Sequence, residues 1–279
     1  GRAIAPVQLL ISVWKQIGGT RSAYERLTKL LEQNPAREAG MALPKPKGTI
    51  AVENITAAPP GGKIPVIKGL TFSLAAGEVL GIIGPSGSGK STLARLLVGV
   101  WPAAAGKVRL DNADVYLWNK DELGPHIGYL PQDIELFAGT VSENIARFGE
   151  VHADKVILAA KRAGVHELIL NMPSGYDTPL GDGGTGLSGG QKQRLGLARA
   201  MYDDPSLIVL DEPNSNLDDV GEQALLAAII DLRKRGKTIV LITHRTSIIS
   251  ATNKLLLLHD GMAKMFGPTN QVIEALAQQ

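Results

Sequence analysis

The stretch Gly84-Pro85-Ser86-Gly87-Ser88-Gly89-Lys90-Ser91-Thr92 decides how this chain is interpreted. It fits the pattern G-x-x-x-x-G-K-[ST], whose glycines let the backbone wrap closely around phosphate groups and point its N–H groups at them. A helix that starts at such a loop adds the positive end of its dipole. In this pattern the amine of Lys90 reaches the β- and γ-phosphates, and the hydroxyl of Ser91 ligates Mg²⁺. We therefore expect a nucleotide site here.

The segments around this loop indicate an α/β fold. Residues 79–83 form a short apolar run before the loop, and residues 91–97 follow it with a helical pattern. A tight strand-to-helix turn also favours glycine, but strand, loop and helix in this order favour phosphate binding. Residues 207–210 and 238–242 are further apolar runs of strand length. Continuous apolar runs indicate strands buried on both faces, hence a mainly parallel sheet covered by helices.

Three other segments complete the expected elements of this domain. Residues 49–56 are predicted to be its first strand, and a hairpin around Gly61-Gly62 returns through residues 66–74. Residues 141–170 have a largely helical pattern.

The first 48 residues differ from the rest. Residues 22–32 carry apolar side chains at helical spacing, and Asn34-Pro35 ends this helix. Residues 34–48 are predicted to be an exposed linker. Residues 3–14 are mostly apolar but too short to cross a bilayer, which takes roughly 20 apolar residues, so we expect a buried or interfacial helix. Because the chain starts with Gly1-Arg2 rather than Met, we expect a fragment.

Composition excludes some classes of function. Hydrophobic residues make up 44% and charged residues 20%, as in an ordinary globular protein. Lys and Arg (29) barely exceed Asp and Glu (27), so no basic surface for nucleic acid is expected. The chain has no Cys, which excludes disulfides and thiolate zinc sites.

Two further motifs narrow the class of nucleotide-binding protein. The sequence Leu187-Ser188-Gly189-Gly190-Gln191 resembles the signature of the ABC ATPase family. The acidic pair Asp211-Glu212 comes later, directly after the apolar run 207–210. It matches the Walker B arrangement, in which an Asp at the strand tip serves Mg²⁺ and a neighbouring carboxylate lies beside the attacking water. A glycine turn or a solvated acidic pair would explain either motif alone, but not their combination with the phosphate loop.

Three elements resemble the same family in the same order. Gln132 occupies the Q-loop position, which touches metal and water and senses the membrane domain. The tripeptide Asn216-Leu217-Asp218 stands where the D-loop lies, and His244 matches the switch histidine at the γ-phosphate. The resemblance implies a P-loop NTPase (RecA-like) fold: a mainly parallel sheet, an N-terminal antiparallel β-subdomain and an α-helical signature subdomain.

Finer resemblances point to the exporter branch of the family. Residues 136–145 are similar to the exporter pattern after the Q-loop, and residues 175–183 resemble the X-loop, with Asp182 where exporters usually have Glu. Residues 1–33 resemble the C-terminal tail of a transmembrane domain in type I secretion exporters, most of all the permease/ATPases that export metalloproteases. The expected organisation is therefore this tail (1–33), a linker (34–48) and an ABC ATPase domain (49–279).

One position departs from the exporter pattern. Exporters usually carry an aromatic residue, most often Tyr, shortly after the first strand, where it stacks on adenine. Pro59 holds that place here. The adenine platform is therefore expected to be reduced or to be supplied by another residue.

The resemblance implies an Mg²⁺-dependent ATPase with defined roles for its motif residues. The catalytic residues would be Glu212, His244, Gln132 and Lys90. The residues that bind the metal would be Ser91, Gln132 and Asp211. Nucleotide contacts would come from Gly84, Pro85, Ser86, Gly87, Ser88, Gly89, Lys90, Ser91 and Thr92, and from Ser188, Gly189, Gly190 and Gln191 of a second copy of the chain.

The resemblance also implies partners and a place in the cell. The partners would be the second copy, a transmembrane domain on the same native chain, a periplasmic adaptor and an outer-membrane channel. The domain would lie at the cytoplasmic face of a bacterial inner membrane.

Three alternatives remain to be weighed. Soluble ABC ATPases of chromosome maintenance or DNA repair insert long coiled coils between the phosphate loop and the signature, and no heptad run lies between Lys90 and Leu187. A nucleotide-binding scaffold without catalysis would be expected to lack Glu212 or His244. An importer ATPase shares the core motifs, but the X-loop-like segment and the membrane-domain-like start argue against it.

Overall fold

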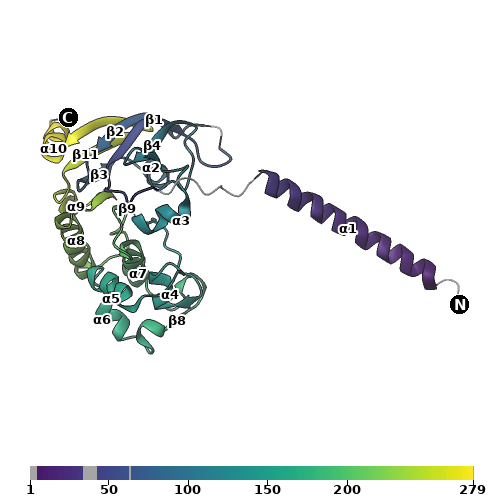
Figure 1. Ribbon diagram of the computed structural model, residues 1–279. Coiled ribbons are helices and arrows are strands. Elements are labelled where there is room, and N and C mark those ends of the chain that lie inside the picture. Colours follow the sequence, from purple (N-terminus) through teal and green to yellow (C-terminus); the bar gives the residue numbers. More distant parts are fainter. Residues whose placement is uncertain (1–4, 34–42, 63, 279) are drawn as a thin grey trace. The chain divides into compact units, whose positions relative to one another are not determined.

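The structure is a computed structural model that describes residues 5–33, 43–62 and 64–278. The chain divides into two units, Gly1–Ala42 and Leu43–Gln279. The described part of the first unit is one helix, α1 (Ala5–Gln33), which joins two segments that the sequence pattern suggested separately (Figure 1). Its side chain Trp14 is 79% exposed. In the described ranges of the chain, we find no helix whose length and apolar character suffice for a membrane span.

The expected linker 34–48 is only partly described, since residues 34–42 lie outside the described residues. Its last part is not fully exposed as predicted, because Pro46 and Gly48 are buried. The hydroxyl of Thr238 donates a 2.8 Å hydrogen bond to the carbonyl of Gly48, and the carboxylate of Asp111 accepts from the amide of Thr49 at 2.9 Å. Residues 48–49 are thus held against Asp111 and Thr238 within the second unit.

The centre of the second unit is a six-stranded, mainly parallel sheet with the strand order β12-β11-β3-β10-β9-β6. Strands β11, β3, β10, β9 and β6 run parallel, and β12 pairs antiparallel with β11 at the edge. Every residue of β9 and β10 is buried, as their continuous apolar runs predicted. The strands are β3 (Val79–Ile83), β6 (Ile127–Leu130), β9 (Leu207–Asp211), β10 (Thr238–Ile242), β11 (Lys254–His259) and β12 (Met262–Pro268).

A second, antiparallel sheet has the order β2-β1-β4-β5. It contains β1 (Ile50–Ala57), β2 (Ile67–Leu74), β4 (Ala105–Leu110) and β5 (Ala113–Asp114), and the hairpin β1–β2 was predicted. Its apolar face shares one hydrophobic core with β3 and with helix α2 (Lys90–Leu97). A two-stranded ribbon of β7 (Gly139–Thr140) and β8 (Pro179–Leu180) stands apart.

Short helices gather in the lower half of Figure 1 and form the expected helical subdomain. The region 141–170 is not one long helix but three short ones, separated by turns. The helices of the second unit besides α2 are α3 (Lys120–Leu123), α4 (Val141–Ile145), α5 (Ala153–Arg162), α6 (His166–Leu170), α7 (Gly189–Met201), α8 (Asp219–Lys234), α9 (Thr246–Ile249) and α10 (Thr269–Ala277).

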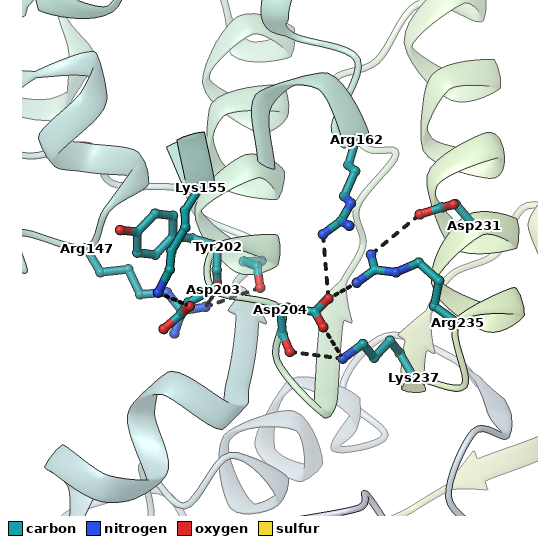
Figure 2. A network of polar contacts seen from close by, with 10 residues as sticks. Arg147, Lys155, Arg162, Tyr202, Asp203, Asp204, Asp231, Arg235 and Lys237 are labelled. Atoms are coloured by element: carbon teal, nitrogen blue, oxygen red, sulfur yellow. Dashed lines mark hydrogen bonds and ion pairs between the residues drawn. The ribbon is translucent and has the colours of Figure 1, made fainter. Parts of the chain in front are cut away.

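Ion pairs join the helical subdomain to the sheet at the turn between α7 and β9 (Figure 2). The carboxylate of Asp204 pairs with Arg235, with Lys237 at 2.8 Å and with Arg162 of α5 at 3.5 Å. The neighbouring Asp203 pairs with Lys155 of α5 at 2.6 Å. Three cations therefore surround one carboxylate where three elements meet.

Candidate nucleotide site

The phosphate loop lies between β3 and α2, as the sequence pattern predicted. Gly84 (φ 151°) and Gly89 (φ 101°) need backbone angles that side chains disfavour, and a Cβ on Gly84 would lie 2.0 Å from the carbonyl oxygen of Leu258. Lys90, the first residue of α2, is only 7% exposed. Its amine donates to the loop carbonyls of Gly84 (2.8 Å) and Pro85 (2.9 Å). The loop therefore presents an ammonium group beside the N-terminus of a helix.

A cavity opens in front of this loop. Its lining consists of Val66, Ser86, Gly87, Gly89, Lys90, Ser91, Thr92, Gln132 and Glu212. Burial lowers the pKa of Lys90, while the negative charges of Glu212 and Asp211 oppose that shift. No aromatic side chain belongs to this described lining, in line with Pro59 at the usual aromatic place. The cavity thus combines a cation with polar groups and offers one aliphatic side chain, Val66.

The acidic pair stands at the C-terminal end of β9, next to the loop. Asp211 ends the strand and is 1% exposed. Burial raises the pKa of its carboxyl group, although a hydrogen bond from Ser91 acts to lower that pKa. Its Oδ1 is buried without a hydrogen-bond partner in the described structure. A buried acceptor of this kind is costly unless a partner binds it, so a cation between Asp211 and Ser91 would suit the site.

The carboxylate of Glu212 lies next to two other predicted catalytic residues, Gln132 and His244. Its Oε2 accepts a 3.1 Å hydrogen bond from Nε2 of Gln132, and its Oε1 lies 3.8 Å from Nε2 of His244. His244 follows β10, so the C-terminal ends of neighbouring parallel strands bring these residues together. Hard cations such as Mg²⁺ take oxygen ligands, many of them from substrate phosphates. Among the described residues there is no group of three His, Cys, Asp or Glu that could hold a metal ion.

The signature residues lie elsewhere. Ser188 caps α7: its hydroxyl accepts from the amide of Gln191 at 3.2 Å, and the side chain of Gln191 accepts from the amide of Ser188 at 2.8 Å. Ser188 and Gly189 are exposed. None of residues 188–191 belongs to the lining of the phosphate-loop cavity. The chain therefore does not bring its own signature to its own phosphate loop.

Thr243 and Asn214 belong to this region but were not anticipated from the sequence. The hydroxyl of Thr243 donates a 3.0 Å hydrogen bond to Oδ1 of Asn214 and accepts from the amide of Arg245 at 3.1 Å. It thereby fixes the chain on either side of His244. A lone Thr after a strand gives no sequence signal for this role.

Residues 67–215 match the family described as ABC transporter. This chain belongs to the ABC transporter family. The PrsD protein of Rhizobium meliloti, a type I secretion system ATP-binding protein, is 48% identical over 98% of this chain and 47% of its own length. The CyaB protein of Bordetella pertussis, a cyclolysin secretion/processing ATP-binding protein, is 33% identical over 99% of this chain and 39% of its own length.

A solved structure agrees with the ABC transporter fold. A bacterial Atm1-family ABC exporter with ATP bound is 29% identical, with a TM-score of 0.85, over 98% of this chain and 49% of that chain. The expected fold class and the resemblance to exporter ATPases of type I secretion are thus confirmed. The chain is an ABC ATPase domain of the exporter type, and it spans about half or less of the length of these relatives.

Proposed function

We propose that the chain hydrolyses MgATP in a sandwich of two copies and thereby drives an exporter. One observation carries this proposal. Glu212 lies in the phosphate-loop cavity with Gln132 and near His244, whereas residues 188–191 of the same chain's signature do not line that cavity. The site is chemically equipped for hydrolysis but lacks the signature until a second copy supplies it.

Each residue of the site has a role in this proposal. Lys90 and the loop amides bind the β- and γ-phosphates. Glu212 orients and deprotonates the attacking water, and its hydrogen bond with Gln132 sets the direction of its carboxylate. His244 stabilises the charge that develops on the γ-phosphate. Ser188, Gly190 and Gln191 of the partner would close over the same phosphate.

The residues present also fit Mg²⁺. Ser91, Asp211 and Gln132 would hold the ion, because the buried Oδ1 of Asp211 needs a partner. Bound there, Mg²⁺ neutralises phosphate charge.

The activity of the longer exporter is part of the proposal. Besides a second copy, we propose a transmembrane domain on the same native chain, with residues 1–33 as its C-terminal tail and residues 34–48 as the linker to the ATPase domain. An apolar groove beside the Q-loop, lined by Leu123, Pro131 and Phe137 among others, offers a place for that membrane domain. The cargo would be a protein, passed on through a periplasmic adaptor and an outer-membrane channel. The ATPase would work at the cytoplasmic face of the bacterial inner membrane.

Phosphate release tests the hydrolysis. The chain should release phosphate from ATP with Mg²⁺ but not with EDTA, and Lys90→Ala should abolish both ATP binding and release. Equal release by Lys90→Ala would contradict the assignment of the site.

A chimera tests the export. This chain should replace the corresponding segment of the Rhizobium meliloti relative and preserve secretion by that system, whereas the same chimera with Lys90→Ala should not. Secretion lost in the unmutated chimera, despite normal ATPase activity, would contradict the secretion proposal alone.

A further inference from the structure

A buried amide connects the signature helix with the acidic pair. Gln193, on α7, is 1% exposed. Its Nε2 donates a 3.0 Å hydrogen bond to the backbone carbonyl of Glu212, and its Oε1 accepts a 3.0 Å hydrogen bond from the backbone amide of Asn216. One partner can only accept and the other can only donate, which fixes the orientation of the amide group. A side chain of one helix therefore bridges both ends of the turn 212–216.

This turn holds Glu212 in an unusual conformation. The backbone of Glu212 has φ 50°, in the left-handed region that costs a residue with a side chain about 1–2 kcal/mol. Its carbonyl accepts from Gln193 and from the amide of Ser215 at 3.2 Å, and its amide donates to Ile242 at 2.9 Å. Conformations of this kind persist only where the surroundings enforce them. The direction of the Glu212 side chain thus depends on these backbone hydrogen bonds.

The start of α7 lies directly against the same turn. A Cβ on Gly190 would lie 2.8 Å from the carbonyl oxygen of Asn216, and one on Gly189 would lie 3.3 Å from its Cβ. Only glycine permits this approach without a shift of the D-loop segment. The signature turn, the D-loop and the backbone of Glu212 are therefore packed as one body, with Gln193 at its centre.

We propose that Gln193 is a positioning residue for ATP hydrolysis. Its two backbone hydrogen bonds hold the carboxylate of Glu212 in register with the signature turn of the same chain. The inference rests on the proposed function, in which this signature contacts the nucleotide of the partner's site while Glu212 serves its own. Gln193 therefore links the two nucleotide sites of the dimer: closure of the signature over one ATP aligns the base at the other.

Two substitutions separate this role from a purely structural one. Gln193→Met keeps the volume but removes both backbone hydrogen bonds, together with a longer one of 3.4 Å to Oγ of Ser215. Gln193→Glu keeps an acceptor for Asn216 but removes the donor to Glu212. A misplacement of about 1 Å at a reacting group can lower a rate about 100-fold, so we expect both variants to lose about 10- to 100-fold in kcat. The Kd for ATP, set by the phosphate loop, should stay within about twofold of the unmutated value.

Thr252→Val is the matched control. Thr252 is also buried, and its hydroxyl donates to Ile249 at 2.7 Å and bonds to Thr269 at 2.8 Å, outside the nucleotide site. This variant should lower Tm but leave kcat unchanged.

The three possible failures have different meanings. Full turnover in both Gln193 variants, with an active unmutated chain, would overturn this inference alone. Loss of ATP binding in both variants would overturn it as well, since a residue needed only for folding gives that result. An unmutated chain that binds ATP without hydrolysing it would overturn the proposed function together with the inference.

Discussion

The side-chain amide of Gln132 donates a 3.1 Å hydrogen bond to the carboxylate of Glu212, although 80 positions separate the two residues along the chain. Gln132 follows β6 and Glu212 follows β9, and these neighbouring strands are parallel. Their carboxyl ends therefore meet at one edge of the sheet, next to the phosphate loop. A change at the Q-loop reaches the proposed general base through a single hydrogen bond.

The first prediction concerns this base. Glu212→Gln removes the carboxylate that accepts the proton of water but keeps the size of the side chain. ATP binding should persist while kcat falls by roughly 10²–10⁴, the usual contribution of general acid–base catalysis. Phosphate release measured beside the Kd for ATP tests this, with the exposed Glu274→Gln of α10 as a control that should retain full activity. Retention of most turnover by Glu212→Gln would remove Glu212 from this role.

The second prediction concerns recognition of the nucleobase, adenine or guanine. Pro59 is half-buried after β1, and no aromatic side chain belongs to the described lining of the cavity. Phosphate contacts should therefore dominate, with only a modest preference for ATP over GTP. A base–aromatic stack is worth about 1–3 kcal/mol, so Pro59→Tyr should tighten ATP binding about tenfold or more.

Competition binding of ATP and GTP measures both effects. Pro60→Tyr, one residue along on an exposed position, is the matched control and should change little. A strong preference for ATP in the unmutated chain would mean that another residue supplies the adenine platform.

The third prediction concerns Arg147, a half-buried charged residue. Its guanidinium donates to five backbone carbonyls, at 2.8–3.3 Å, and burial lowers its pKa to about 10. Those carbonyls belong to Gly124, Ile127, Arg199, Ala200 and Tyr202, so Arg147 ties the end of α7 to the start of β6.

Removal of Arg147 should destabilise the domain strongly. Arg147→Met leaves these acceptors without their donor, and we expect a loss on the order of 3 kcal/mol in the free energy of unfolding. Arg109→Met, which removes a partly exposed pair with Glu53, should cost less than about 1 kcal/mol. Urea unfolding compares the two variants. Equal midpoints would show that the guanidinium of Arg147 contributes no more to stability than the partly exposed ion pair of Arg109.

The fourth prediction concerns pH and the ion-pair cluster in Figure 2. Burial, with the like charges of Arg235, Lys45 and Arg162, lowers the pKa of Lys237 from 10.5 to about 8. Between these two values the unfolded chain binds more protons than the folded one, so the contribution of Lys237 to stability rises with pH. The cost of its buried charge is present below pH 8 and is relieved as pH increases through this window.

Thermal unfolding at pH 7.5 and 9.5 tests the sign. The free energy of unfolding of the unmutated chain, minus that of Lys237→Met, should be larger at pH 9.5 than at pH 7.5. A difference that moves in the opposite direction would mean that the 2.8 Å pair with Asp204 dominates and keeps Lys237 charged.

The features that could be predicted best from the sequence are those formed by consecutive residues. The strand–loop–helix order of β3 and α2 follows from an apolar run, glycines with special backbone angles and a helical pattern, all within some twenty consecutive residues. The β1–β2 hairpin and the buried strands β9 and β10 were likewise visible as patterns of apolar residues and turns. The cluster of Lys90, Gln132, Glu212 and His244 could be expected only because the family motifs occur in order.

Features that depend on distant backbone groups could not be predicted. The helical pattern of residues 141–170 gave no sign of the turn after α4, where Arg147 and Phe148 take φ values of 58° and 57°. The side chain of Arg147 stabilises that turn by donating to main-chain carbonyls of α7 and β6. Which main-chain carbonyls will be available as acceptors cannot be recognised from the sequence. Gln193 is similar, since its partners are main-chain groups of Glu212 and Asn216 rather than side chains with a recognisable pattern.

The central claim is that ATP hydrolysis requires two copies of the chain. The dependence of the ATPase rate on protein concentration tests this claim most directly. In the proposed sandwich, the signature and the phosphate loop of one chain serve different nucleotides, so a complete site would form only when two chains meet. The measurement is phosphate release per chain at saturating MgATP, over a dilution series that extends well below the concentration at which light scattering detects dimers. We predict a rate per chain that rises with concentration and then levels off as dimers fill. A rate per chain that is constant from dilute monomer upward would contradict the account.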